Sequence, residues 1–340
     1  PSPDEIVFGA NMTSLTFHIS RAIGKTLMPG DEIVLSRLDH DANIAPWLAL
    51  QELGVVIRFV DFKPFDCTLD MAAMEAAISS KTKVVAVGYA SNATGTINDV
   101  NRIAELAHAA GAWLYVDAVH FAPHGSIDVQ ATDCDFLVCS TYKFFGPHLG
   151  ALYGRYALLD ALPAYKVRPA DNKPPGKFQT GTANFEAMAG ATAAINYLAS
   201  VGQRFGGQYT TRFMEFAGRR RDLKVAMTAI RAYEPDLCRR LIAGLQEISD
   251  LTIYGITDPS SYDRRVPTVS FTIEGITPQI IAQRLGEANI FAWNGNFYAL
   301  SVTEQLGLEE KGGMLRVGLN HYNTAAEVDY LVGVLSDLPR

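Results

Sequence analysis

The sequence predicts an α/β fold, in which a mostly parallel sheet has helices on both faces and a small C-terminal α+β domain follows. Two observations support this fold class. In residues 1–200, short apolar segments alternate with amphipathic helical segments, which is the pattern of a parallel sheet covered on both sides. Polar residues follow directly on several of these apolar segments, as they do where parallel strands end at a ligand site.

The expected elements of the first domain begin with a strand at residues 5–8 and a helix whose apolar positions run from Leu15 to Leu27. A helix that opens at residues 39–43 and runs towards Gly54 is also expected. The remaining strands are predicted at 32–38, 55–60, 83–89, 112–116 and 136–139, and the remaining helices at 70–78, 99–110 and 186–200.

The second half of the chain has a different pattern. Residues 165–181 are rich in Pro, Lys and Gly and predict a long functional loop. Residues 212–248 predict helix with a break near Glu234 and Pro235. Strands are expected at 251–254, 268–273, near 290–293 and at 314–319, with helices at 278–288 and after the capping box that begins at Thr324. We therefore expect a large domain at 1–200, connecting helices at 201–235 and a small domain at 236–340.

Composition excludes several classes of protein. The net charge is −7, which argues against a general nucleic-acid binder, and the one basic cluster, at residues 219–221, lies in a helical stretch rich in both signs and predicts a solvated helix face. No apolar run reaches the ~18 residues that a membrane span needs. The four cysteines form no CxxC pair, which predicts reduced cysteines in a cytoplasmic protein and no metal site. Because the chain opens at Pro1 directly into a strand, we expect a further segment before it.

A lysine and an aspartate give the strongest chemical signal. Lys143 follows the strand at 136–139 and precedes a loop rich in Gly and Pro, and Asp117 follows the strand at 112–116. A lone lysine in a loop is usually a surface residue. A lysine that can form a Schiff base, together with an acid for a pyridinium nitrogen, is the protein's standard contribution to pyridoxal phosphate chemistry.

Other polar residues stand at comparable positions along the chain. Each follows an apolar strand, so a parallel sheet would bring them to one edge. Singly, each has a structural explanation: a helix cap, a turn residue or a polar loop residue. The residues at this edge are expected to be His40, Asn92, Asp117, His120, Ser140 and Lys143. At Asn11 and Met12, a strand, a short turn and a helix N-terminus predict an anion site.

Together these segments resemble the class V aminotransferase and cysteine desulfurase family of fold-type I pyridoxal phosphate enzymes. The resemblance covers nearly the whole chain. It is carried by GANMTSLTF, DHDAN, SNATG, VDAVHFAPH, DCDFLVCSTYKFFGPHLGALY, QTGTANFE and LRVGLNHYNT. It implies the fold-type I architecture with a seven-stranded sheet, pyridoxal 5'-phosphate as cofactor, an amino acid as substrate and a homodimer.

The resemblance also implies residue roles around the cofactor ring. Lys143 would form the Schiff base and move the α-proton, and Asp117 would keep the pyridine nitrogen protonated. His40 matches the family histidine that stacks on the ring. Asn92 matches the residue near the phenolic oxygen, and His120 stands where relatives often carry glutamine.

The phosphate group of the cofactor has its own implied contacts. The backbone around Asn11 and Met12, with Ser140 and Tyr142, would hold it, although desulfurases commonly have histidine at the position of Tyr142. Thr182 matches a threonine that relatives donate to the phosphate of the neighbouring subunit. The resemblance therefore implies an active site shared across a dimer.

The expected substrate-binding residues differ from those of cysteine desulfurases at one position. Arg316 matches the arginine that binds the substrate α-carboxylate, for which a bidentate guanidinium is suited. Desulfurases carry a catalytic cysteine shortly before it, but residues 293–300 contain no cysteine, and Tyr298 stands near that position. Cys139 is expected to be buried in its strand. Persulfide formation by cysteine desulfurase chemistry is therefore not expected.

An aminotransferase is the activity that we expect. A lyase or epimerase similar to selenocysteine/cysteine lyase or isopenicillin-N epimerase stays open, because the same residues support these reactions. A non-catalytic protein that keeps the fold of the family is the other alternative.

Overall fold

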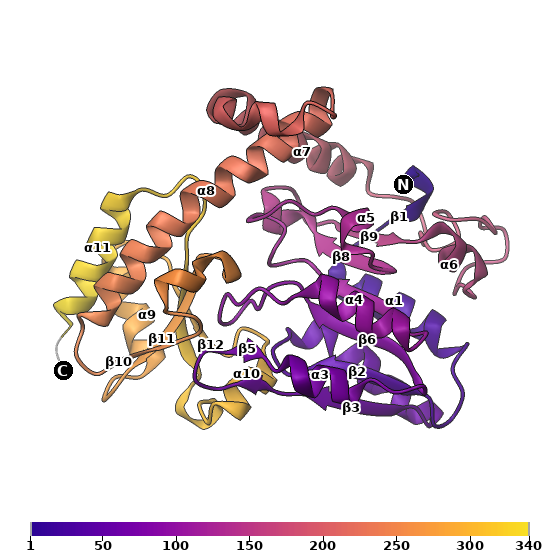
Figure 1. Ribbon diagram of the computed structural model, residues 1–340, viewed down its shortest axis with the longest axis horizontal. Coiled ribbons are helices and arrows are strands. Elements are labelled where there is room, and N and C mark those ends of the chain that lie inside the picture. Colours follow the sequence, from indigo (N-terminus) through magenta and orange to yellow (C-terminus); the bar gives the residue numbers. More distant parts are fainter. Residues whose placement is uncertain (1, 339–340) are drawn as a thin grey trace.

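The computed structural model of the chain describes residues 2–338, and its two larger sheets are joined by long helices (Figure 1). We call the seven-stranded sheet with its helices the large domain, and the four-stranded sheet with its helices the small domain. The seven strands lie in the order β1-β9-β8-β7-β6-β2-β3. They are β1 (Ile6–Gly9), β2 (Glu32–Ser36), β3 (Val56–Val60), β6 (Thr82–Gly88), β7 (Trp113–Asp117), β8 (Phe136–Ser140) and β9 (Gly150–Gly154). Five neighbouring strands of this sheet, β3, β2, β6, β7 and β8, run parallel to one another, which confirms the predicted fold class.

Alternating residues of the central strands explain why both faces of this sheet are covered. Val84 and Ala86 of β6 belong to the apolar core beneath α1, whereas Val85 and Val87 belong to the core beneath α3 and α4. The helices of the large domain are α1 (Met12–Gly24), α2 (Ala45–Leu48), α3 (Met71–Ala77), α4 (Val100–Ala109), α5 (Val129–Thr132) and α6 (Tyr156–Ala161). A small hairpin, β4 (Phe62–Lys63) with β5 (Thr68–Leu69), leads into α3.

The small domain is built on an antiparallel sheet. Its strands lie in the order β10-β11-β13-β12. They are β10 (Leu251–Tyr254), β11 (Thr268–Ile273), β12 (Trp293–Gly295) and β13 (Met314–Gly318), and the helices are α9 (Pro278–Glu287), α10 (Leu300–Gln305) and α11 (Ala325–Ser336). The capping box predicted at Thr324 is confirmed, because its side chain accepts from the Glu327 N–H and Glu327 bonds back to Thr324.

Two long helices connect the domains (Figure 1). They are α7 (Phe185–Phe205) and α8 (Gly218–Gln246). The predicted helix break near Glu234 and Pro235 is wrong, because α8 continues through both residues. Ile230 packs against Leu198 of α7 before the proline, and Leu237 enters the core of the small domain after it. Burial on both sides of Pro235 outweighs the ~3 kcal/mol that an interior proline costs.

Three further details differ from the expectations. The expected helix up to Gly54 is divided into a 3₁₀ turn (Asp41–Asn43), α2 and a second 3₁₀ turn (Ala49–Leu53), with Pro46 in the first turn of α2. Strand β9 was not expected, and it runs antiparallel between β8 and β1. The strand expected near 290–293 begins later, at Trp293. In the described part of the chain, no helix is long and apolar enough to span a membrane.

Candidate active site

A cavity of about 570 Å³ lies between the two domains at the carboxyl edge of the parallel strands. It brings together most of the residues that the sequence singled out. From the large domain these are Met12, His40, Asn92, Asp117, His120, Ser140, Tyr142 and Lys143, and from the small domain Arg316. The expected convergence of strand ends at one edge is confirmed as geometry.

Two predicted residues lie outside the cavity lining. Asn11 is exposed and caps α1, because its Oδ1 accepts the Ser14 N–H at 2.9 Å. Thr182 is also exposed, in the irregular segment before α7. Its expected partner is the phosphate of a neighbouring subunit, so its role stays a prediction.

Asp117 forms part of the floor of the cavity. It ends β7 beside Gly88 of β6, and its Oδ1 accepts the Val119 N–H at 2.9 Å. Burial raises the pKa of this carboxyl to about 6, against the Val119 hydrogen bond and the positive charge of Lys143, which both lower it. The floor thus holds a buried carboxyl that is mostly ionised at neutral pH, and the nearby cation favours this charged form.

Lys143 follows β8 in a 3₁₀ turn, Thr141–Phe144. Burial lowers the pKa of its amine, and the nearby Arg316 charge lowers it further, while Asp117 acts in the opposite direction. A larger share of neutral amine results, which is the nucleophilic form. The ring of Tyr142 lies 5.3 Å from Lys143 Nζ and stacks on the His148 ring with centroids 4.9 Å apart.

The N-terminus of α1 meets the end of β8 at the base of the cavity. The Met12 N–H donates to Ser140 Oγ at 2.9 Å. Gly150 of β9 permits this approach, because a Cβ added there would lie 2.5 Å from the carbonyl carbon of Asn11. The start of α1 and the Ser140 hydroxyl therefore meet at the base of the cavity, where the partial positive charge of a helix N-terminus favours an anion.

Two histidines stand on the walls. His40 Nδ1 accepts the Ala42 N–H at 3.0 Å, and the His40 ring stacks on Tyr298 with centroids 5.6 Å apart. Burial lowers the pKa of His40 to about 4, assisted by the charges of Lys143 and Arg316, so its ring is neutral at physiological pH. His120 Nε2 hydrogen-bonds Thr268 Oγ1 of β11 at 2.8 Å, which ties this wall to the small domain.

Arg316 comes from β13 and enters the cavity from the side of the small domain. Its Nη1 donates to the Asn92 carbonyl at 2.7 Å, and its guanidinium carbon lies 4.4 Å from the centroid of the Phe297 ring. Burial lowers its pKa to about 10, which leaves it charged at neutral pH. Within residues 2–338 no ion pair joins Arg316 to a carboxylate. A half-buried arginine of this kind is suited to bind an incoming carboxylate.

Asp39 lines the same cavity and was not predicted. It is 2% exposed, its Oδ2 accepts from Asn43 Nδ2 at 2.7 Å, and its Oδ1 has no hydrogen-bond partner among the described residues. Burial raises its pKa to about 7, and the charge of Asp117 adds to that rise. Its position directly before His40, shortly after β2, was the signal that could have indicated it.

Comparison with known proteins identifies the family. The profile of the aminotransferase class-V family matches residues 1–220 and 217–331. The chain belongs to the aminotransferase class-V family. The aminotransferase-like protein FGM3 of Gibberella zeae is 36% identical over 344 residues, which cover 98% of this chain and 78% of that protein. A cysteine desulfurase of Serratia proteamaculans is 30% identical over 354 residues, which cover 100% of this chain and 79% of that protein.

Solved structures agree with this class-V assignment. A cysteine desulfurase from Thermococcus onnurineus NA1 superposes with a TM-score of 0.84 at 27% identity, and 98% of this chain and 79% of that one are covered. The predicted resemblance and fold are therefore confirmed. Enzymes of the class-V family use pyridoxal 5'-phosphate and act on amino acids.

The cavity of this class-V protein fits that cofactor. Lys143 supplies an amine with a lowered pKa, Asp117 a buried carboxyl, and Met12 with Ser140 an anion cradle. Asn92 Oδ1 is buried without a hydrogen-bond partner in the described part of the chain, so the site has polar capacity left for a bound group.

The cysteines of this class-V protein lie away from the cavity. Cys67, Cys134 and Cys238 are buried, whereas Cys139, which was expected to be buried, is half-buried in β8. Cys139 faces a separate groove formed with α7 and α8 residues. Burial raises the pKa of Cys67, Cys134 and Cys139 to about 12 each, which keeps these thiols protonated.

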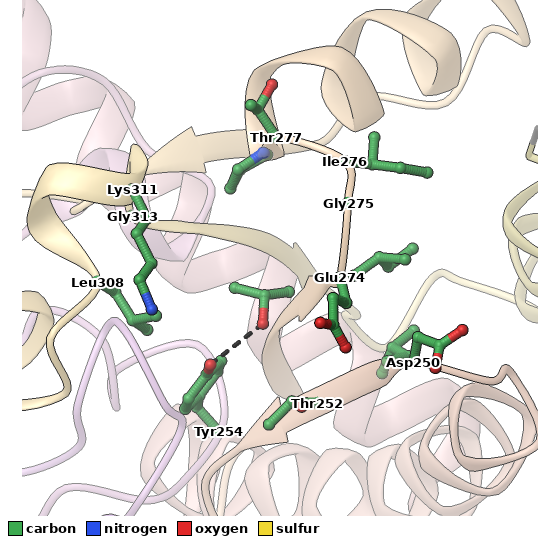
Figure 2. Close-up of a pocket in the computed structure, with 14 residues that line it drawn as sticks. Asp250, Thr252, Tyr254, Glu274, Gly275, Ile276, Thr277, Leu308, Lys311 and Gly313 are labelled. Carbon is green, nitrogen blue, oxygen red and sulfur yellow. Dashed lines mark hydrogen bonds between the residues drawn. The ribbon is translucent and has the colours of Figure 1, made fainter. Parts of the chain in front are cut away.

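A second hollow lies in the small domain, beside β10 and β11 (Figure 2). Tyr254, Glu274 and Lys311 surround it, and Tyr254 OH lies 3.1 Å from Thr272 Oγ1. It contains none of the residues that the sequence predicted for the site. The cavity at Lys143 is therefore the candidate active site, because there an amine with a lowered pKa, buried carboxyls and an arginine converge.

Proposed function

We propose that this protein is a pyridoxal phosphate-dependent enzyme that transfers the amino group of an amino acid. One observation carries the proposal: Lys143, Asp117 and Arg316 line a single cavity between the domains. When bound, the cofactor supplies an electron sink for the charge that develops at the substrate Cα.

Lys143 and Asp117 have separate roles towards the cofactor in this proposal. Lys143 Nζ would hold the cofactor and move the α-proton of the substrate, for which the lowered pKa of its amine is suited. The Asp117 carboxylate would keep the ring nitrogen protonated. His40 would stack on the ring, and Asn92 and His120 would lie near its phenolic oxygen.

The phosphate would be held by the start of α1 near Asn11 and Met12, by Ser140 and by Tyr142. The Met12 N–H and the Ser140 hydroxyl already lie within hydrogen-bonding distance of each other, which supports this placement. Thr182 would contribute to the phosphate site of a neighbouring subunit, which makes the proposed working unit a homodimer.

Arg316 would bind the α-carboxylate of the substrate. The half-buried guanidinium, held at one nitrogen by the Asn92 carbonyl, keeps further N–H groups for a carboxylate. This contact would orient the Cα–H bond towards Lys143.

Transamination is proposed over desulfuration because no thiol lines the cavity in the described part of the chain. Sulfur transfer needs a thiolate close to the substrate, but none of the four cysteines lines the cavity with Arg316, and burial raises the pKa of each thiol and keeps it protonated.

A visible absorption titration tests the proposal. The purified protein is loaded with pyridoxal phosphate and titrated with a panel of amino acids, with Lys143→Ala as the control. We expect an absorption band that one amino acid converts to the amine form of the cofactor. Lys143→Ala should lose the borohydride-fixed link to the protein. Consumption of an amino acid without the amine form would favour a lyase or epimerase, and no bound cofactor at all would refute the proposal.

A further inference from the structure

The loop between β12 and α10 has an unusual backbone. Phe297 and Tyr298 are consecutive and both adopt left-handed conformations, each with φ of 58°. Side chains other than glycine rarely occupy this region, and two in succession are retained only where surrounding contacts hold them. The contacts of Phe297 and Tyr298 therefore show which residues this backbone conformation brings together.

Phe297 contacts the residues that would bind the substrate carboxylate. Its ring is 5% exposed and lies against the Arg316 guanidinium at 4.4 Å. Its carbonyl accepts from Asn92 Nδ2 at 2.8 Å, while the Asn92 carbonyl accepts from Arg316 Nη1 at 2.7 Å. These three residues form a closed set of contacts that fixes the plane of the guanidinium.

Tyr298 contacts the other wall of the cavity. Its ring stacks on His40 at a centroid distance of 5.6 Å and an interplanar angle of 24°. Its carbonyl accepts the Asp41 N–H at 2.6 Å, from the residue that follows His40. The Tyr298 side chain is 73% exposed, so burial of its own surface does not explain its conformation.

The loop has both internal partners and partners in the large domain. It closes on itself, because the Asn296 carbonyl accepts the Ala299 N–H at 2.8 Å and Asn296 Oδ1 accepts the Tyr298 N–H at 3.0 Å. In addition, both carbonyls of the left-handed pair accept from the large domain, and both rings lie on side chains that line the cavity.

We propose that Phe297 and Tyr298 are positioning residues that bridge the two domains, Phe297 holding Arg316 in a fixed orientation and Tyr298 holding His40. This assignment rests on the proposed function, in which Arg316 binds the substrate carboxylate. The left-handed backbone turns consecutive side chains to different partners, one in each wall of the site.

The test of Phe297 measures carboxylate binding. Loaded enzyme is titrated with acetate, followed by visible absorption, and the KM for the donor amino acid is measured in parallel. Phe297→Leu keeps apolar volume but removes the aromatic face. The dissociation constant for acetate and the KM for the amino acid should therefore both rise about three- to tenfold, with kcat nearly unchanged. Phe297→Tyr keeps the face and should behave as the unaltered protein. Phe65→Leu, at a side chain that is 80% exposed, is the matched control.

The test of Tyr298 uses cofactor-free protein and needs no turnover. Tyr298→Gly removes the ring and also relieves the left-handed strain, so the fold should be retained or stabilised. We expect NMR titration to show that the pKa of His40 moves up towards its ordinary value, because the uncovered ring becomes hydrated. Tyr298→Phe should leave that titration unchanged.

The results separate the positioning roles of Phe297 and Tyr298 from the proposed enzyme function. Acetate affinity unchanged in Phe297→Leu, or His40 titration unchanged in Tyr298→Gly, would overturn the positioning role while the unaltered protein still converts its amino acid. Failure of the unaltered protein to bind cofactor would instead refute the proposed function.

Discussion

The two walls of the cavity are built in different ways. The wall of the large domain consists of strand ends, where Asp117 is fixed by the parallel pairing of β7 with β6 and Ser140 by the antiparallel pairing of β8 with β9. The wall of the small domain consists of Arg316 on β13 and the loop that holds Phe297 and Tyr298. A sheet edge fixes atoms rigidly, whereas a loop on a second domain can vary without changing that edge.

The two walls also differ in the ionisable groups that they carry. The wall of the large domain carries titratable groups with displaced pKa values: the buried Asp39 and Asp117 and the half-buried His40 and Lys143. The wall of the small domain contributes the permanent cation Arg316. Groups that exchange protons thus lie on the rigid wall, and the group that would recognise the substrate lies on the other. We expect substitutions on the first wall to change kcat and those on the second to change KM.

The largest effect should come from Asp117→Asn. The amide keeps the shape of the side chain but removes the charge at the ring nitrogen, so kcat should fall by about 10²- to 10³-fold, as when one preorganised electrostatic contact is lost. Steady-state kinetics with a donor amino acid measures this, with circular dichroism to check folding. A kcat close to that of the unaltered protein would mean that the rigid wall does not carry the chemistry.

Arg316→Lys should have the next largest effect, and on KM instead. Lysine keeps the charge but cannot form the bidentate pair, so the KM for the amino acid should rise about 10- to 100-fold, equivalent to one charge-assisted hydrogen bond. The same kinetic assay, run over a wide range of amino-acid concentrations, separates KM from kcat. A fall in kcat with unchanged KM would contradict the division between the two walls.

More of the large-domain wall than of the small-domain wall could be predicted from the sequence, for physical reasons. Asp117, Ser140 and Lys143 could be located because a buried strand has a local apolar pattern and its end is visible in the sequence. Asp39 was missed because its significance comes from burial beside Gly88, where an added Cβ would lie 3.3 Å from its Oδ1. Such burial depends on how distant strands pack.

The small-domain wall was predicted less completely. Arg316 was found through the resemblance to a family, because a lone arginine on a strand has no local signal. The contacts of Phe297 with Asn92 depend on residues far apart in sequence, and no local pattern reports them. The uninterrupted α8 shows the same limit, since packing against both domains overrode the local effect of Pro235.

A smaller effect, on the pH dependence of stability, is expected from Asp39→Asn, and it tests whether the wall of the large domain buries a titrating carboxyl. Burial raises its pKa from 3.8 to about 7, so the folded state binds the proton more tightly than the unfolded state. Its contribution to stability is complete below pH 4 and is lost as the pH rises towards 7. Relative to Asp39→Asn, the free energy of unfolding of the unaltered protein should therefore fall by about 1.4 kcal/mol per pH unit in that window.

Urea unfolding of cofactor-free protein between pH 4 and 8 measures this difference. Asp236→Asn, at a side chain that is 78% exposed, is the matched control. Parallel pH profiles for the unaltered protein and Asp39→Asn would show that the rigid wall does not bury a titrating carboxyl at Asp39.

The smallest effect is expected in α8, which belongs to neither wall but connects their domains. Pro235 lacks the N–H that would donate to the Arg231 carbonyl in a regular helix. Pro235→Ala restores that donor, and the gain exceeds the loss of rigidity in the unfolded chain, so the free energy of unfolding should rise by about 1 kcal/mol with unchanged kcat and KM. Pro278→Ala is the matched control, because Pro278 stands in the first turn of α9, where no helical donor is missing. If Pro235→Ala instead altered KM, the placement of the small-domain wall would depend on the shape of this helix, and the two walls would not be independent.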